Sequence, residues 1–168
     1  MNVIQAIKTK RSVREYAGQE VPLELITQIV DAGRRAQSSR NSQPWTFIVV
    51  RQRQRLQDLA ACGMYAQPLG RAAFGVALVS AVEWGFDIGQ AAAYMQLAGW
   101  SLGVSSCLVW LGEADKARAL LGVLEDQHIE MALAFGYALG IVPKSAKKGG
   151  RKPLDEVVRW ETWEGNKP

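Results

Sequence analysis

The stretch AQSSRNSQPWTFIVV, residues 36–50, joins a polar segment directly to an apolar one. Its second half, Trp45 to Val50, consists of β-branched and aromatic residues, a composition that predicts a buried strand. Its first half brings serines, an arginine, an asparagine and a glutamine to the mouth of that strand. One interpretation is an ordinary loop in which serine and asparagine side chains cap a turn. The other is a binding segment, and residues elsewhere in the chain decide between the two.

Helical and strand patterns alternate on both sides of this stretch, which predicts a single α+β domain over residues 1–168. The C-terminal stretch 154–163 fits either a strand or a helix. Apolar residues recur at helical spacing over 3–10, 22–37, 51–62, 87–102 and 113–122, and runs typical of buried strands cover 74–80, 105–110 and 129–139.

The stretch from Asp87 to Leu102 is predicted to be a long central helix. Its alanines and glycines recur at helical steps and are small enough to let neighbouring elements approach closely. Gly103 fits the position of a C-terminal cap. We therefore expect this helix to be apolar on most sides and to lie at the centre of the fold.

Composition limits the class of protein. The 168 residues fit one domain, 48% of them are hydrophobic, and the net charge is +4. This hydrophobic content excludes a disordered chain, and no apolar run approaches the ~20 residues of a membrane span. The N-terminus lacks an apolar signal core with a cleavage site, so we expect a cytoplasmic protein.

Few residues are of the types that bind metals or act as nucleophiles. The chain has one histidine, His128, and two cysteines, Cys62 and Cys107, that lie far apart. A structural zinc site needs about four such ligands, so we predict no metal site and two reduced, partly buried thiols. A Walker loop, a G-x-G-x-x-G motif and a G-x-S-x-G elbow are absent from the sequence. If the protein is an enzyme, we expect a cofactor to supply its chemistry.

Two basic runs lie at opposite ends of the sequence, KTKRSVR near the N-terminus and KSAKKGGRK near the C-terminus. Arg11, Ser12 and Arg14 offer two guanidinium groups and a hydroxyl, which suit a phosphate group. Arg151 follows two glycines that would let the backbone approach a ligand closely. Such runs are usually solvated surface, and a nucleic-acid-binding surface is a further alternative. If the fold brings the two runs together, they form one anion pocket.

Four sequence blocks, in this order, resemble the nitroreductase-type FMN-dependent oxidoreductases. They are KRSVREY at 10–16, SSRNSQPWTFIVV at 38–50, GVSSCLVWLG at 103–112 and GRKPLDEVV at 150–158. The resemblance covers nearly the whole chain. It implies a nitroreductase-like α+β fold with a mixed, mainly antiparallel sheet flanked by helices. It also implies an intertwined homodimer with FMN at the interface.

The resemblance also implies which residues bind the cofactor. Arg11, Ser12 and Arg151 match positions that hold the FMN phosphate and ribityl chain, and Lys10 is predicted to bind the cofactor beside them. Arg14 matches a position near the pyrimidine edge of the flavin, where a cation would stabilise the negative charge of the reduced ring. The alternative for Arg14 is a further phosphate ligand.

A second group of residues is implied to serve the other subunit. Ser38, Ser39 and Asn41 match positions that reach the flavin bound mainly by the neighbouring chain, and Gln43 and Pro44 match positions that shape that loop. Under the resemblance, the polar residues ahead of the strand line the pocket of the partner.

The remaining implied contacts lie around the flavin ring. The backbone at Leu111 and Gly112 matches the segment whose amide faces flavin N5, and Gln67 is predicted to reach the pyrimidine ring with Arg71 close behind. The chain is short between Gly63 and Phe74, where longer members of the family have a helical excursion over the flavin. This difference predicts a more open pocket.

The sequence departs from the family pattern at two positions. Gln37 stands where many members have a proline, and Gly149 stands where many have a second basic residue, a role that Lys147 or Lys148 would take.

A C-terminal arm, about residues 153–168, is predicted to reach the partner subunit through Trp160 and Trp163. Trp84 and Phe86 are candidates for the substrate side of the pocket.

The function implied is an FMN-dependent NAD(P)H oxidoreductase. Hydride would pass through flavin N5 in a ping-pong cycle to quinone- or nitroaromatic-like acceptors. FAD in place of FMN stays open, as does the choice between NADH and NADPH. Alternatives are other flavin chemistry (dehalogenation, heterocycle oxidation or flavin breakdown) and a dimer that binds FMN without turnover.

Overall fold

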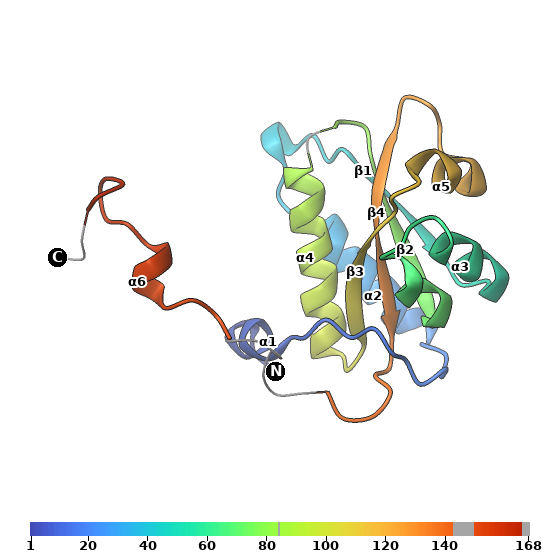
Figure 1. The fold of residues 1–168 in the computed structure, drawn as a ribbon, viewed down its shortest axis with the longest axis horizontal. Coiled ribbons are helices and arrows are strands. Elements are labelled where there is room, and N and C mark those ends of the chain that lie inside the picture. The colour runs from blue at the N-terminus through green and yellow to red at the C-terminus, as the bar shows by residue number, and fades with distance from the viewer. Residues whose placement is uncertain (84, 143–149, 166–168) are drawn as a thin grey trace.

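The computed structural model describes residues 1–83, 85–142 and 150–165 of the chain (Figure 1). At its centre is an antiparallel sheet with the strand order β1-β2-β4-β3, so that β1 and β3 are its two edges. A parallel contact occurs at the isolated bridge between Ser12 and Ser106, so the predicted mixture of strand directions is limited to that contact in the described residues. The strands are β1 (Trp45–Val50), β2 (Phe74–Ser80), β3 (Ser105–Trp110) and β4 (His128–Gly136).

The predicted helices are present, with small differences at their ends. α1 begins with a capping box between Asn2 and Gln5, and α4 is followed by Gly103 in the left-handed conformation, φ 80°. Pro22 precedes the first helical residue of α2 and does not occupy that position itself. The helices are α1 (Val3–Thr9), α2 (Leu23–Arg34), α3 (Arg53–Ala60), α4 (Phe86–Ser101), α5 (Ala114–Leu121) and α6 (Leu154–Val157), and single 3-10 turns form η1 (Ser39–Asn41) and η2 (Gln67–Arg71).

Hydrophobic residues pack on both faces of the sheet because successive strand residues point in opposite directions. In β2, Phe74, Val76 and Leu78 pack against α2 and α4, whereas Ala77 and Val79 pack on the other face against α3, η2 and α5. Figure 1 shows α4 and α3 on opposite sides of the sheet. Both central strands are therefore buried on two faces, which explains their continuous apolar runs.

The long helix α4 packs closely on α2 and on the sheet. A Cβ atom at Gly33 of α2 would overlap the Met95 side chain, and one at Gly99 would lie 3.1 Å from the Phe135 ring. The absence of side chains at these two positions allows the close approach predicted from the small residues of the central helix. None of the helices in the described ranges is long and apolar enough to cross a bilayer.

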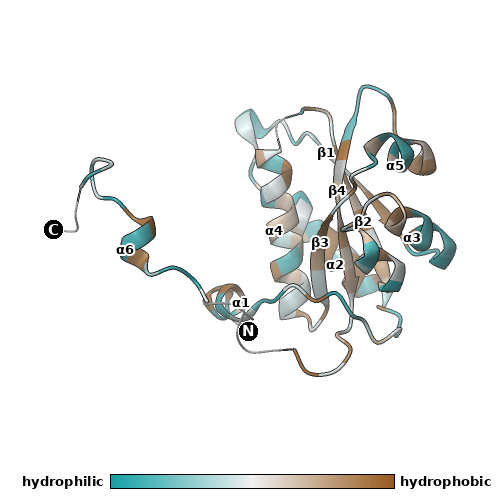
Figure 2. Ribbon diagram, in the orientation of Figure 1, coloured by the Kyte–Doolittle hydropathy of each residue, from teal (hydrophilic) through white to brown (hydrophobic). Residues whose placement is uncertain are grey.

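The C-terminal residues leave the body of the domain. Figure 1 shows the chain from Gly150 through α6 extending past α1, away from the sheet. Leu154, Val157 and Trp163 have exposed fractions of 73%, 59% and 85%, and Figure 2 shows apolar residues on α6 with no other described helix or strand packed against them. The ambiguous stretch 154–163 thus contains one helical turn followed by bends.

Candidate functional site

The segment that follows α1 is fixed along the β3 edge of the sheet. Val13 donates its N–H to the Ser106 carbonyl over 2.9 Å, and the Leu139 N–H donates to the Glu15 carbonyl over 3.0 Å. The ring of Tyr16 is buried, and its hydroxyl lies 2.7 Å from the Val13 carbonyl and 3.0 Å from the Ala134 carbonyl. These contacts turn Tyr16 inward and leave the side chains of Arg14 and Glu15 on the outside.

Gly136 makes room for the Tyr16 ring. A Cβ atom at residue 136 would lie 2.8 Å from Cδ1 of Tyr16, so a side chain there would displace the ring. Burial also raises the pKa of the Tyr16 phenol well above its ordinary range. The phenol therefore stays protonated and keeps its donor role.

A pocket of about 470 Å³ opens between this segment, η2 and the β3 edge of the sheet. Its volume is in the range of small-molecule sites, ~300–1,000 Å³. Its lining combines charged and amide groups with apolar groups. The lining residues are Arg14, Glu15, Met64, Tyr65, Gln67, Pro68, Arg71, Cys107, Leu108, Val109, Trp110 and Met131.

The apolar side of the pocket comes from the outward face of β3 and β4. Cys107 and Val109 are buried, whereas Leu108 and Trp110 have exposed fractions of 43% and 51%. Met131 is the register partner of Trp110 and is 38% exposed. This alternation creates a half-exposed apolar surface at the edge of the sheet, which suits the face of a planar ring.

The two basic runs approach each other beside the pocket. Burial is the main cause that lowers the pKa of the Lys10 amine, with Cys107 opposing the shift and Arg151 adding to it. Burial raises the pKa of the Cys107 thiol, and Arg14 and Lys10 oppose that shift. The electrostatic influence of Cys107 and Arg151 on Lys10 indicates that the three residues lie in the same region. One anion site formed by both ends of the chain stays a prediction, and Lys147 and Lys148 lie outside the described residues.

Two other predicted phosphate ligands do not line the pocket. Arg11 turns back onto the end of α1, where its guanidinium donates to the Lys8 carbonyl over 3.1 Å and to the Lys10 carbonyl over 2.9 Å. Ser12 is exposed and is held through its backbone by the bridge to Ser106. Both residues lie within two positions of Lys10 in the chain, so they stay candidates for the rim of an anion site.

The polar loop ahead of β1 lies away from the pocket within this chain. β1 and β3 are opposite edges of the sheet, and the start of β1 lies at the opposite end from the Ser12 bridge. Ser38 Oγ accepts the Gln43 N–H over 2.9 Å, and the Ser39 N–H donates to Asp87 at the start of α4 over 3.1 Å. The turn-capping interpretation is therefore seen for Ser38. A role of this loop in the pocket of a second chain stays a prediction.

The loop has a constrained backbone. Arg40, Asn41 and Gln43 adopt positive φ values of 52°, 55° and 47°, a conformation that is uncommon for residues other than glycine. Its shape is thus set by the hydrogen bonds at Ser38 and Ser39. Residues 37–44 contain no glycine, so the sequence does not indicate such a turn.

The remaining predicted residues lie at the pocket or next to it. Gln67 lines the pocket and donates to the Ala60 carbonyl over 3.3 Å. Leu111 has a buried side chain, and its neighbour Gly112 is packed against Gly63, where a Cβ atom would lie 2.7 Å from the Gly112 nitrogen. The backbone at 111–112 is thus fixed directly beside Trp110.

Sequence reasoning missed several lining residues. Leu108 and Met131 belong to apolar runs, and such a run does not show whether its strand lies at the edge of the sheet. Met64 lies in a stretch without periodicity. Glu15 forms an ion pair with Arg71, 56 positions away in the chain, and no local pattern indicates that pairing. Trp84, one of the two candidates for the substrate side, lies outside the described residues, and Phe86 is 67% exposed at the start of α4.

An α+β fold with a pocket at a sheet edge, flanked by basic groups, defines a class of small-molecule-binding protein, and comparison with known proteins identifies the family. The family model described as "Nitroreductase family" matches residues 7–73 and 77–137. The chain therefore belongs to the nitroreductase family, which confirms the family and the oxidoreductase class predicted from the four sequence blocks.

Curated relatives and solved structures agree with this membership. A protein of Archaeoglobus fulgidus, provisionally named NADH dehydrogenase/NAD(P)H nitroreductase, is 32% identical over 80% of this chain and 84% of its own length. A relative of Methanothermobacter thermautotrophicus with the same name is 37% identical over 67% of this chain, and the match spans 61% of that relative. The structure of an FMN-dependent nitroreductase from Clostridium difficile superposes with a TM-score of 0.83 at 25% identity and covers 95% of this chain and 99% of its own.

Proposed function

We propose that this chain is an FMN-dependent NAD(P)H oxidoreductase that reduces quinone- or nitroaromatic-like acceptors in a ping-pong cycle. When bound, FMN supplies hydride transfer between a nicotinamide donor and the acceptor. The observation that carries the proposal is a basic cluster from both ends of the chain beside a pocket with an apolar floor. The names of the relatives give the same cofactor and electron donor.

Lys10 and Arg151 are the residues we assign to the phosphate of FMN, with Ser12 and Arg11 at the rim. Burial makes the charged form of Lys10 unfavourable, as the direction of its pKa shift indicates. A phosphate beside it would offset that cost and accept charge-assisted hydrogen bonds. The fit of this cofactor thus rests on a half-buried amine whose charge interacts with Cys107 of the pocket lining.

Arg14 and Gln67 are the residues we assign to the polar edge of the flavin ring. Both line the same pocket as Leu108, Trp110 and Met131. The cation supplies positive potential on one side, and the apolar surface excludes water on the other, so charge is stabilised more strongly than in bulk solvent. No side chain of the pocket has to act as an acid or base for hydride transfer.

A second copy of the chain would complete the site. The exposed apolar residues of α6 have no packing partner among the described residues of this chain, and the Ser38–Gln43 loop is held in a fixed shape away from its own pocket. We therefore propose a homodimer in which the C-terminal arm lies on the partner and Ser38, Ser39 and Asn41 approach the partner's flavin. This arrangement gives the loop a role that its own chain does not provide.

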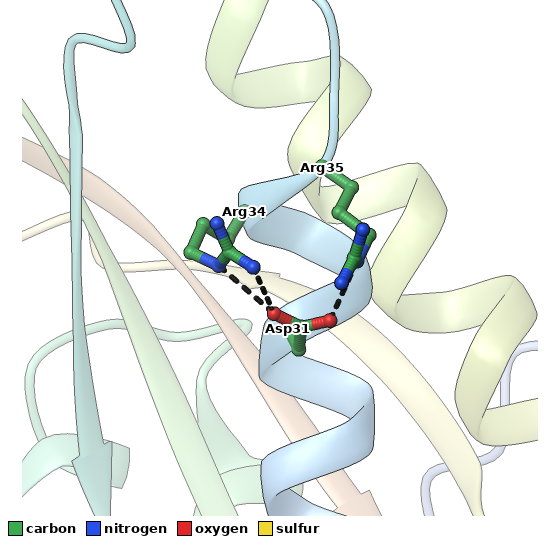
Figure 3. A network of polar contacts seen from close by, with 3 residues as sticks. All are labelled: Asp31, Arg34 and Arg35. Atoms are coloured by element: carbon green, nitrogen blue, oxygen red, sulfur yellow. Dashed lines mark hydrogen bonds and ion pairs between the residues drawn. The ribbon is translucent and has the colours of Figure 1, made fainter.

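Cofactor binding tests the assignment of the phosphate site. The double variant Lys10→Ala, Arg151→Ala removes two cations and should bind FMN at least about 100-fold more weakly, because each hydrogen bond to a charged group contributes about 1.5–3 kcal/mol. Arg34→Ala is the matched control, since Arg34 is exposed and paired with Asp31 on α2 (Figure 3). Flavin fluorescence titration measures the FMN affinity of the double variant and of the control. Stoichiometric FMN in the double variant would contradict the assignment.

Reduction experiments separate the proposed activity from its alternatives. Under nitrogen, NADH or NADPH should bleach the flavin absorbance, and a quinone should restore it. Bleaching without turnover of quinones or nitroaromatics would favour other flavin chemistry, and no bleaching at all would favour a dimer that stores or senses FMN. A wild-type protein that does not bind FMN would overturn the proposed function.

A further inference from the structure

An ion pair connects the two segments on the polar side of the pocket. Glu15, on the segment after α1, accepts a hydrogen bond from Arg71 at the end of η2, and both residues line the pocket. Their side chains are 56% and 61% exposed. Glu15 directly follows Arg14, so two cations and one carboxylate share this side of the pocket.

The ion pair is poorly suited to a purely structural role. Exposed pairs contribute little to stability, because water solvates the separated charges almost as well. The segment around Glu15 is already fixed by Val13, Tyr16 and the hydrogen bond from Leu139. η2 is anchored by the fully buried side chain of Leu69. Removing the pair therefore leaves both segments with their own attachments.

The pair has a direct effect on the charge of the pocket. Among the described residues, Arg71 has a carboxylate partner, and no carboxylate is paired with Arg14, the other arginine that lines the pocket. We propose that Glu15 is a positioning residue that holds Arg71 at the pocket and neutralises it, so that Arg14 supplies the net positive charge facing the cofactor. This inference rests on the proposed function, since it concerns the balance between oxidised and reduced FMN.

The sign of the effect follows from the charge of the cofactor. Reduced FMN carries more negative charge than oxidised FMN, so each added positive charge in the pocket favours the reduced form. Loss of Glu15 adds one positive charge, and loss of Arg71 removes one. If the ion pair were only a structural tether, either substitution would break the same contact. Both substitutions would then shift the preference for reduced FMN in the same direction.

The experiment compares four variants by their dissociation constants for oxidised and reduced FMN. Glu15→Gln should favour reduced FMN by roughly five- to tenfold relative to the wild type, from the interaction of charges a few ångströms apart. A tenfold change corresponds to about 30 mV in the midpoint potential of a two-electron couple. Arg71→Gln should shift the ratio of the two dissociation constants in the opposite direction. In the double variant this ratio should return near the wild-type value. Glu15→Asp keeps the carboxylate and should keep the wild-type ratio.

Asp115→Asn is the control, because it removes a carboxylate paired with Arg118 on α5, away from the pocket lining. It should leave the ratio unchanged. Equal shifts in the same direction for Glu15→Gln and Arg71→Gln, or no shift in either, would overturn the inference while the proposed function stands. A wild-type protein that binds neither form of FMN would overturn both.

Discussion

Tyr16→Phe is the substitution that most directly tests how the N-terminal segment is held. The phenol is 7% exposed, and its hydroxyl lies within hydrogen-bonding distance of the Val13 and Ala134 carbonyls. The segment that this side chain anchors carries Lys10, Arg14 and Glu15. A loss of its hydroxyl should therefore affect both stability and cofactor binding.

The magnitude follows from what the variant keeps and loses. Phenylalanine retains the ring, so the transfer free energy of the buried apolar surface is nearly unchanged. One hydrogen bond is lost, which costs about 0.5–1.5 kcal/mol, and a buried acceptor left unpaired raises the cost to about 1–3 kcal/mol. Ala134 lies in a strand paired on both sides, so Val13 is the acceptor at risk. We expect the free energy of unfolding to fall by about 1–2 kcal/mol.

Urea denaturation and FMN titration are the assays. A looser segment should bind FMN about three- to tenfold more weakly, which corresponds to roughly 0.7–1.4 kcal/mol. Tyr94→Phe is the control, because Tyr94 on α4 is 37% exposed and carries the same chemical change. The control should alter neither quantity.

The pH dependence gives a second measurement. Burial raises the pKa of Tyr16 above its ordinary value of 10.0, so the folded protein binds the phenolic proton more tightly than the unfolded chain. The stability that this group contributes is complete below pH ~10 and is lost as the pH rises above it. The difference between wild type and Tyr16→Phe should therefore narrow above pH ~10. The reasoning fails if the two proteins have equal stability at neutral pH and the same dependence on pH.

Three further predictions test other parts of the structure. Gly63→Ala should lower the free energy of unfolding by about 2–3 kcal/mol, because its Cβ would lie 2.7 Å from the Gly112 nitrogen. Gly89→Ala should raise that free energy by about 0.5–1 kcal/mol, because nothing lies within 4 Å of the added Cβ. Equal effects of the two substitutions in urea denaturation would contradict this prediction. Lys10→Met should stabilise the FMN-free protein by removing a desolvated charge and should weaken FMN binding about 10- to 100-fold. Thermal unfolding and titration measure the two effects, and unchanged FMN affinity would refute the assignment. Truncation after Pro153 removes the exposed apolar residues of the arm and should weaken the dimer by at least about tenfold; an unchanged dissociation constant in sedimentation experiments would rule out the proposed arm.

Strand and helix positions followed from the sequence because burial imposes a periodicity on it. β1, β2 and β3 begin and end where their apolar runs do. For the central strand β2 the reason is that both of its faces are covered. The end of β4 was predicted at residue 139 but lies at Gly136, where the chain makes room for Tyr16. A contact with a distant segment therefore ended a strand whose local pattern continues.

The site was predictable where it depends on residue type and less so where it depends on tertiary contacts. Charge and family resemblance predict that the two basic runs form one site, and the small contribution of Arg151 to the lowered pKa of Lys10 is consistent with that prediction. The inward turn of Arg11 and the Glu15–Arg71 pair were not expected, because each is set by the position of a neighbouring segment. The left-handed backbone at Arg40 and Asn41 also lacks the glycines that usually indicate it.

The hydrogen bond between Tyr16 and Ala134 spans 118 positions of the chain. During synthesis, the N-terminal segment leaves the ribosome before β4 and cannot form this contact until β4 has emerged as well. Contacts of such separation form slowly because a long loop has to close before they can stabilise anything. Arg151 emerges later still. A nascent chain can pair β1 with β2 well before this point, but the two residues proposed to hold the phosphate, Lys10 and Arg151, can meet only after Arg151 has emerged.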